Sequence, residues 1–195
     1  MDEVVAQAAA SSGRAYVALE EQLRAGGQEA TDPLRRRLAD PDPVNQLMAR
    51  VLLAWIAGQA PECSEALEYL QALERRLAKT PVGSPPPVAV ATELDDRFGP
   101  RVAECLALRL VKELDWPHWR VMGVLFYLRD QQVAETTSAL LRFGTLTSND
   151  AWRQAAVEAI QAIQDPDLRR KLDLERQRLT AAGQSLPAAL EVLLE

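Results

Sequence analysis

The sequence predicts an all-α protein built as a short solenoid of antiparallel helix pairs, on the strength of three observations. Apolar residues recur at helical spacing along the chain, and no stretch is predicted as a strand. One sequence pattern begins at Val44, at Trp119 and at Trp152, and the last two lie 33 positions apart. Val44 lies 75 positions before Trp119, which is close to two repeats of about 37 residues, a length typical of solenoids made of helix pairs.

The copy that begins at Trp152 gives the clearest helix, predicted over residues 150–164. Asn149 and Asp150 precede it, and both are residue types that cap the amino-terminal end of a helix. Its apolar residues form one narrow stripe, as expected for a helix packed closely against a neighbour. The stripe consists of Trp152, Ala156, Ala159, Ile160 and Ile163.

Start and stop signals divide the first part of the chain into four predicted helices. Gly26 and Gly27 end the first helix, and residues 11–13 offer a break inside it. Pro33 occupies the favoured first turn of the second helix, and the proline-rich corner at 40–43 turns the chain into the third. These helices are expected over residues 3–25, 31–39, 44–57 and 61–79.

Similar signals separate the later helices. The helix over 118–129 is apolar nearly all round, which predicts a helix covered on both sides. Asp165 and Pro166 form an Asp-Pro corner like the one at 40–43. The last segment either covers the apolar end of the stacked helices or offers an apolar patch to a partner. These helices are expected over residues 88–98, 100–114, 118–129, 131–143, 150–164 and 165–182, with a short segment around 187–194.

The segment 81–87 is rich in proline and favours an extended polyproline conformation. We interpret it as a linker between helical repeats in residues 1–80 and 88–195, with both parts packed as one solenoid domain. A docking peptide for an aromatic groove is the alternative interpretation.

Composition narrows the classes of function. The chain has 195 residues, a net charge of -6 and 48% hydrophobic residues, which suit a soluble protein and count against nucleic acid or an anionic membrane as partner. We therefore expect a cytoplasmic protein, since neither a signal peptide nor a membrane span is recognisable. Cys63 and Cys105 are far apart in sequence, and we expect both to be reduced core residues.

Few residues of the sequence are candidates for a catalytic role. His118 is the only histidine, which excludes sites that need several histidines, and no glycine-rich phosphate loop is present. We therefore expect no catalytic residues, no cofactor and no metal.

Two short segments are candidates for binding a partner. Trp116 and His118 belong to a cluster in which an aromatic pair and an arginine suit an interface, although Trp119 in the same cluster occupies a core position of the repeat. Arg35 and Arg36 suit an anionic group, although such a run more often forms a solvated face with local ion pairs.

At these positions the chain resembles the HEAT-repeat family of armadillo-type α-solenoids. In that family an Asp-Pro-like corner precedes a helix that starts with an apolar residue and arginine. The segment from Asp150 to Arg153 matches best, Asp115 with Trp119 and Arg120 matches in part, and 40–44 matches the corner but has Asn45 where arginine is usual. The resemblance implies a right-handed solenoid, interrupted by the proline-rich segment, whose surface binds another protein.

The predicted function is therefore a non-catalytic protein–protein interaction module, a scaffold or adaptor in a bacterial assembly, with self-association as a possibility. The alternative is a small acidic inhibitor, such as an immunity protein, that masks a basic toxin or enzyme. A HEAT-like DNA glycosylase is a third hypothesis, which requires tryptophans on a basic groove.

Overall fold

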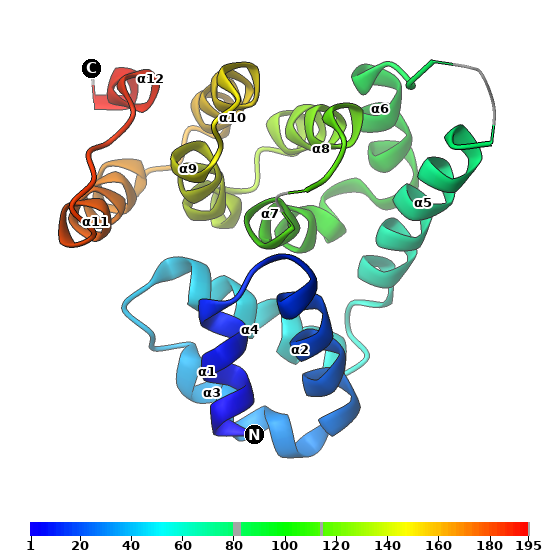
Figure 1. Cartoon of the computed structure of the whole chain (residues 1–195), viewed down its shortest axis with the longest axis vertical. Helices are drawn as coiled ribbons and strands as arrows, with labels where there is room; N and C mark the ends of the chain where they lie inside the picture. Colours follow the sequence, from blue (N-terminus) through cyan, green and yellow to red (C-terminus); the bar gives the residue numbers. More distant parts are fainter. Residues whose placement is uncertain (80–82, 114, 195) are drawn as a thin grey trace.

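The computed structural model describes residues 1–79, 83–113 and 115–194, and every regular element in these residues is a helix (Figure 1). The all-α class predicted from the sequence is therefore confirmed. Short 3-10 helices η1 (Gly99–Val102), η2 (Ala134–Thr136) and η3 (Val192–Leu194) accompany the α-helices. The α-helices are α1 (Asp2–Ala10), α2 (Gly13–Gly26), α3 (Gln28–Arg37), α4 (Pro43–Ile56), α5 (Pro61–Leu77), α6 (Pro87–Phe98), α7 (Ala103–Lys112), α8 (His118–Gln131), α9 (Thr137–Leu146), α10 (Asp150–Ile163), α11 (Leu168–Ala181) and α12 (Ala188–Glu191).

The helices form a lower lobe and two upper rows (Figure 1). The lower lobe consists of α1–α4, which pack on one another. In one upper row α6 contacts α8, α8 contacts α10 and α10 contacts α12; in the other, α7 contacts α9 and α9 contacts α11. Helix α5 leads from the lower lobe to the upper rows, where it contacts η1 and α6.

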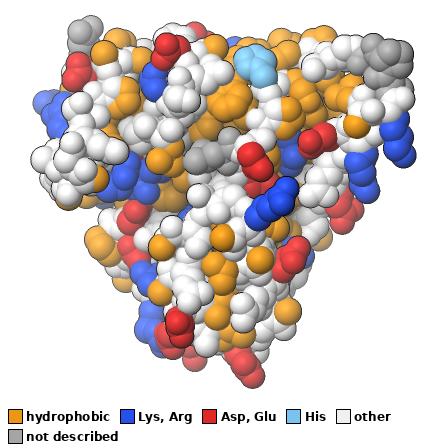
Figure 2. Space-filling view, in the orientation of Figure 1, with side chains coloured by type: hydrophobic (Ala, Val, Ile, Leu, Met, Phe, Trp, Pro, Cys, Tyr) orange, Lys and Arg blue, Asp and Glu red, His pale blue; other side chains and the backbone are white. Residues whose placement is uncertain are grey.

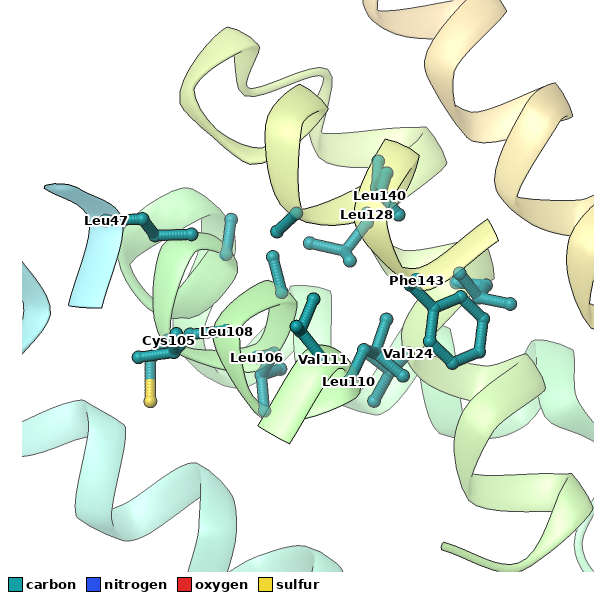
Figure 3. Packing of buried hydrophobic residues seen from close by; sticks show 14 of the residues in the cluster. Leu47, Cys105, Leu106, Leu108, Leu110, Val111, Val124, Leu128, Leu140 and Phe143 are labelled. Carbon is teal, nitrogen blue, oxygen red and sulfur yellow. The ribbon is translucent and has the colours of Figure 1, made fainter. Parts of the chain in front are cut away.

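Helix α7 lies at the centre of the molecule. It packs against α4 of the lower lobe and against α8 and α9, and every α7 residue except Glu104 is buried. Figure 3 shows Leu110 and Val111 of α7 near Val124 of α8 and Phe143 of α9. A single core therefore joins the lobe to the rows.

Two helices of the upper rows approach closely at a glycine. A Cβ atom at Gly123 of α8 would lie 2.8 Å from the Cβ of Val90 on α6, nearer than real Cβ contacts come. The absence of a side chain at Gly123 lets the two helices pack at this distance.

Charged groups are also buried beside α7. The Arg109 guanidinium pairs with Glu20 of α2 and with Glu113. The Lys112 ammonium donates to the carbonyl oxygens of Ala8, Ala9 and Ser11, at 3.0, 2.8 and 3.0 Å, and so covers the carboxyl-terminal end of α1. Burial lowers the pKa of Lys112 to about 8. These contacts connect α1 and α2 to the centre of the fold.

The cysteine prediction is wrong. Cys63 of α5 and Cys105 of α7 are joined by a disulfide, with Cα atoms 6.1 Å apart. Both are buried as expected, but the helices bring them together although 42 positions separate them in sequence. Sequence spacing alone does not reveal such a pairing, because it depends on how α5 and α7 pack.

Most predicted helices are present with boundaries that differ by a few residues. The predicted break at 11–13 separates α1 from α2, where Gly13 has φ +61. The predicted start at 31 is wrong, because Gly27 with φ +50 reverses the chain and α3 begins there, which places Pro33 inside the helix. The predicted helix over 131–143 is displaced to α9, because Gln132 adopts a left-handed conformation that ends α8.

Two further expectations concern exposure and the linker. In the predicted helix over 31–39, the spacing of Leu34 and Leu38 predicts two core positions. Leu34 is buried, but Leu38 is 42% exposed, since α3 ends just before it. Of the proline-rich segment, residues 81 and 82 lie outside the described residues, 83–86 are not helical and Pro87 begins α6. No helix in the described ranges combines the length and the apolar composition that a bilayer crossing needs.

Candidate functional site

The candidate arginines lie on the last turn of α3. Arg35 pairs with Asp32 and Arg36 pairs with Asp2, and all four side chains are largely exposed. The exposure of these side chains and the pair of Arg35 with Asp32 agree with the interpretation of this run as a solvated face with local ion pairs, whereas the pair of Arg36 with Asp2 joins α3 to α1.

Trp116 lies beneath the surface. It is 5% exposed, its indole Nε1 donates to Glu113 at 2.9 Å, and the Arg120 guanidinium covers its ring at 3.8 Å from the centroid. The side chain therefore offers little area to a partner. Arg120 is itself buried and reaches Glu74 of α5, so the cluster ties α8 to α5.

His118 is exposed at the amino-terminal end of α8, where it meets Trp152 of α10. The indole Nε1 of Trp152 donates to Nδ1 of His118 at 2.8 Å, and the two rings are stacked with centroids 6.1 Å apart. Because Nδ1 accepts this hydrogen bond, the neutral imidazole carries its proton on Nε2. The contact also shows that α8 and α10 begin side by side.

The Trp152 ring packs against a second aromatic ring and is only partly buried. It stacks on Phe143 of α9 with centroids 6.3 Å apart. The Arg153 guanidinium donates hydrogen bonds to the carbonyl oxygens of Gly144 and Thr147 and so stabilises the turn before α10. The position of the indole is therefore fixed by both neighbouring helices.

The same side of α8 carries further apolar groups. Met122 and Phe126 follow His118 at intervals of four residues, so the three share one side of the helix, and both are only partly buried. Figure 2 shows hydrophobic side chains on both sides of His118, the pale blue residue. We call His118, Met122, Phe126 and Trp152 the aromatic face.

The structure does not bring all the predicted binding residues together. Helices α3 and α8 lie far apart along the long axis of the molecule (Figure 1), so Arg35 and Arg36 belong to a different surface from His118. Trp119 is buried as expected. Trp152 was expected between helix layers, but it is only partly buried, because its ring lies over Phe143 and beside His118.

A second candidate site was not anticipated from the sequence. A cleft of about 240 Å³ lies where the corner at 41–44 of the lower lobe meets α9 and α11. Figure 2 shows Lys and Arg side chains on the left of the molecule, where the upper rows overhang the lower lobe. We call it the lobe cleft, and its lining includes Pro41, Asp42, Pro43, Val44, Ser138, Arg142, Lys171, Leu174, Glu175, Gln177 and Arg178.

Arg142 joins the two sides of the lobe cleft. Its guanidinium binds Asp42 at 3.0 Å and Glu175 at 2.9 Å, and Arg178 binds Glu175 at 2.7 Å. Asp42 also caps α4 by accepting from the backbone N–H of Val44. One arginine therefore links the amino-terminal end of α4 to α11, and no local motif predicts that link because 100 positions separate Arg142 from Asp42.

Glu175 gives this link a defined pH dependence. Burial acts to raise the pKa of Glu175, but hydrogen bonds from Arg178 and the charge of Arg142 outweigh it and hold the pKa below 4.5. The stabilisation is therefore fully present above pH 4.5 and is lost as the pH falls through the lowered pKa. We expect the difference in free energy of unfolding between the wild type and Glu175→Gln to shrink in that acid range, as measured by urea unfolding.

The matched control is Glu104→Gln, which removes the carboxylate that pairs with Arg50 at a partly exposed position. Its effect on the free energy of unfolding should be small at every pH. A Glu175→Gln effect that is the same at acid and neutral pH would contradict the assignment.

Comparisons with known proteins give no identity. The chain matches no protein-family model, no curated protein and no solved structure. Within the described residues, no group of three or more His, Cys, Asp or Glu side chains is placed to hold a metal ion. The aromatic face and the lobe cleft are therefore the candidate sites.

Proposed function

We propose that the chain is a non-catalytic protein–protein interaction module, a scaffold or adaptor, that binds its partner through the aromatic face. The exposed His118–Trp152 pair is the observation that carries the proposal. Tryptophan is enriched among the residues that dominate binding energy at interfaces, and a ring held in place before binding loses little entropy. The partly buried apolar side chains of Met122 and Phe126, gathered on one side of α8, favour the same function.

The arrangement of the upper rows supports a HEAT-like solenoid as the framework of this module. Successive contacts α6–α8–α10–α12 and α7–α9–α11 form two layers, as expected when helix pairs stack in a solenoid. In such a stack the helices of one layer present a continuous surface. The aromatic face then lies on the α6–α12 layer, on two neighbouring repeats.

The alternative functions differ in the surface that they require. An acidic inhibitor would use the net charge of -6 to bind a cationic partner, and its complex would weaken as salt is raised. A DNA glycosylase would need tryptophans on an open groove, and the burial of Trp116 and Trp119 counts against it.

The disulfide between Cys63 and Cys105 counts against the cytoplasmic location, because cytosolic reductants keep most thiols reduced.

Affinity capture from cells of the source organism tests the proposal. The wild type, His118→Glu and Trp152→Ala should be used as bait in parallel, with Leu38→Ala as the control, an exposed apolar residue beside α3. Proteins captured by the wild type and by the control should be lost with both face variants. His118→Glu keeps the test valid if Trp152→Ala disturbs the fold, because His118 is exposed.

Identical captured proteins for all four baits would overturn the proposal. Light scattering on the same samples measures self-association, which should also weaken in the face variants if the partner is a second copy. Repeating the capture at high salt separates an apolar interface from the acidic inhibitor, because charge attraction is screened.

A further inference from the structure

The disulfide between Cys63 and Cys105 borders a cleft that is separate from the aromatic face and from the lobe cleft. The cleft has a volume of about 420 Å³, and its lining comes mainly from α4, the turn before α5, η1 and α7, with both cysteines included. We call it the disulfide cleft. Figure 3 shows the Cys105 sulfur pointing away from Leu110 and Val111 of the core. The disulfide therefore lies at the boundary between the core and this cleft.

The two cysteines differ slightly in exposure. Cys105 is 5% exposed and Cys63 is 2% exposed, so a reagent that enters the disulfide cleft should react at Cys105. These small exposed fractions leave no area on which a bulky partner could dock. Access to the disulfide is therefore limited to molecules small enough to enter the cleft.

The charges at the disulfide cleft are matched. Arg50 pairs with Glu104 at 2.9 Å, and Arg101 pairs with Glu62 at 3.5 Å. The remaining walls are largely apolar and include Val51, Ala54, Pro100 and Val133. The reactive group of this cleft is therefore the disulfide, and the molecule that reacts there is defined by its sulfur chemistry.

Both cysteines lie in the first turn of a helix. Cys63 is the third residue of α5, which begins at Pro61, and Cys105 is the third residue of α7, which begins at Ala103. The amino-terminal end of a helix carries a partial positive charge, which stabilises a thiolate. A disulfide exchanges faster when the departing sulfur leaves as a stabilised thiolate. The positions of both cysteines therefore favour reversible exchange.

We propose that the Cys63–Cys105 disulfide is a redox-active site, reduced in the folded protein by a small thiol that enters the disulfide cleft. With a dithiol, the first thiolate attacks Cys105 Sγ, and Cys63 leaves as a thiolate at the start of α5. The second thiol of the reductant then attacks the reductant's own sulfur in the mixed disulfide, which closes a cyclic disulfide and releases the Cys105 thiolate. Two electrons and two protons pass from the dithiol to the protein.

Reduction would release α5 from the centre of the fold. The disulfide is the covalent link between α5 and α7, and the larger contacts of α5 are with η1 and α6. Since α5 leads from the lower lobe to the upper rows, its release would loosen the connection between them. The site therefore acts as a redox switch on the position of α5.

The rate of reduction of the oxidised full chain by dithiothreitol tests the proposal. Alkylation followed by mass spectrometry measures the rate, which should rise in proportion to the dithiothreitol concentration. The rate should change less than twofold in 1 M urea, because attack takes place on the folded protein. The same urea raises the unfolded population on the order of tenfold. A rate that rises in urea as steeply as this population would overturn the proposal.

Variants of the lining test the route of entry. Ala54→Phe places a ring in the disulfide cleft and should slow reduction at least tenfold. Gln59→Trp, at an exposed position of the lining, should also slow it and serves if Ala54→Phe disturbs the fold. The control is Ala57→Phe, just after α4 and outside the lining, which should leave the rate unchanged. Equal rates for all these variants would contradict entry through the cleft.

Reduced thioredoxin distinguishes a protein thiol from a small one. At the same concentration of thiol groups, it should reduce the folded protein no faster than dithiothreitol, because the buried sulfur atoms are beyond its reach. Faster reduction by thioredoxin would overturn the assignment to a small thiol.

Hydrogen exchange measures the release of α5. After reduction without oxygen, backbone amides of 61–77 should exchange at least tenfold faster, whereas those of α8 and α10 should keep their rates. The variant with both cysteines replaced by alanine should show the same exchange with and without reductant. An equal rise in exchange over the whole chain would contradict a switch at α5. Because the aromatic face takes no part, these results are independent of the capture experiment.

Discussion

Replacement of both Cys63 and Cys105 by alanine should lower the free energy of unfolding by about 4 kcal/mol. The disulfide closes a loop of 42 residues. A cross-link of this span lowers the conformational entropy of the unfolded chain, which stabilises the folded state by about 4 kcal/mol. For a protein of this size the melting temperature should fall by on the order of 10 °C. Thermal unfolding followed by circular dichroism measures both quantities.

A reductant provides the matched control. The reductant should lower the melting temperature of the wild type toward that of the double alanine variant. It should leave the melting temperature of the variant unchanged. Mass spectrometry under non-reducing conditions reports the oxidation state directly. Two free thiols in the oxidised protein would contradict the pairing.

Replacement of Arg109 by methionine should destabilise the protein by about 3–5 kcal/mol, because it leaves Glu20 charged and buried without its partner. Burial raises the pKa of Glu20. The loss of stability caused by Arg109→Met should therefore be smallest at low pH, where the Glu20 carboxyl is neutral in the folded and the unfolded protein, and should grow as the pH rises. Urea unfolding at several pH values measures this dependence.

The double variant Glu20→Met, Arg109→Met tests the cause. Removal of both charges should recover much of the stability, since an apolar pair of similar volume pays no desolvation cost. As a comparison, Arg50→Met breaks the more exposed pair with Glu104 and should cost less than about 1 kcal/mol. Equal costs for Arg50→Met and Arg109→Met would show that burial of the pair is unimportant.

The sequence predicted the helices well because their signals are local. Apolar spacing and the corner at 40–43 place α4 and α5 almost correctly, and Asn149 caps α10 as expected, accepting from the N–H groups of Ala151 and Trp152. The misplaced start of α3 depends on one backbone angle at Gly27, which composition does not reveal.

The binding surfaces were less predictable because they depend on which helices meet. His118 was singled out from a local cluster, but its partner Trp152 was assigned to the interior from its position in the repeat. Arg142 gave no local signal, since Asp42 and Glu175 approach it only after the lobe packs on the rows. The buried pair of Glu20 and Arg109 was missed for the same reason, because charged residues are usually predicted to be exposed.

The position of α7 determines how the chain responds to cleavage. A protease cut within 83–86 would divide the polypeptide between the lower lobe with α5 and the upper rows, but the core of α7 needs both pieces. Lys112 and Arg109 bind α1 and α2 from the opposite piece, and the sulfur link between α5 and α7 joins the pieces covalently. The nicked chain should therefore melt in one cooperative step, as a single folding unit.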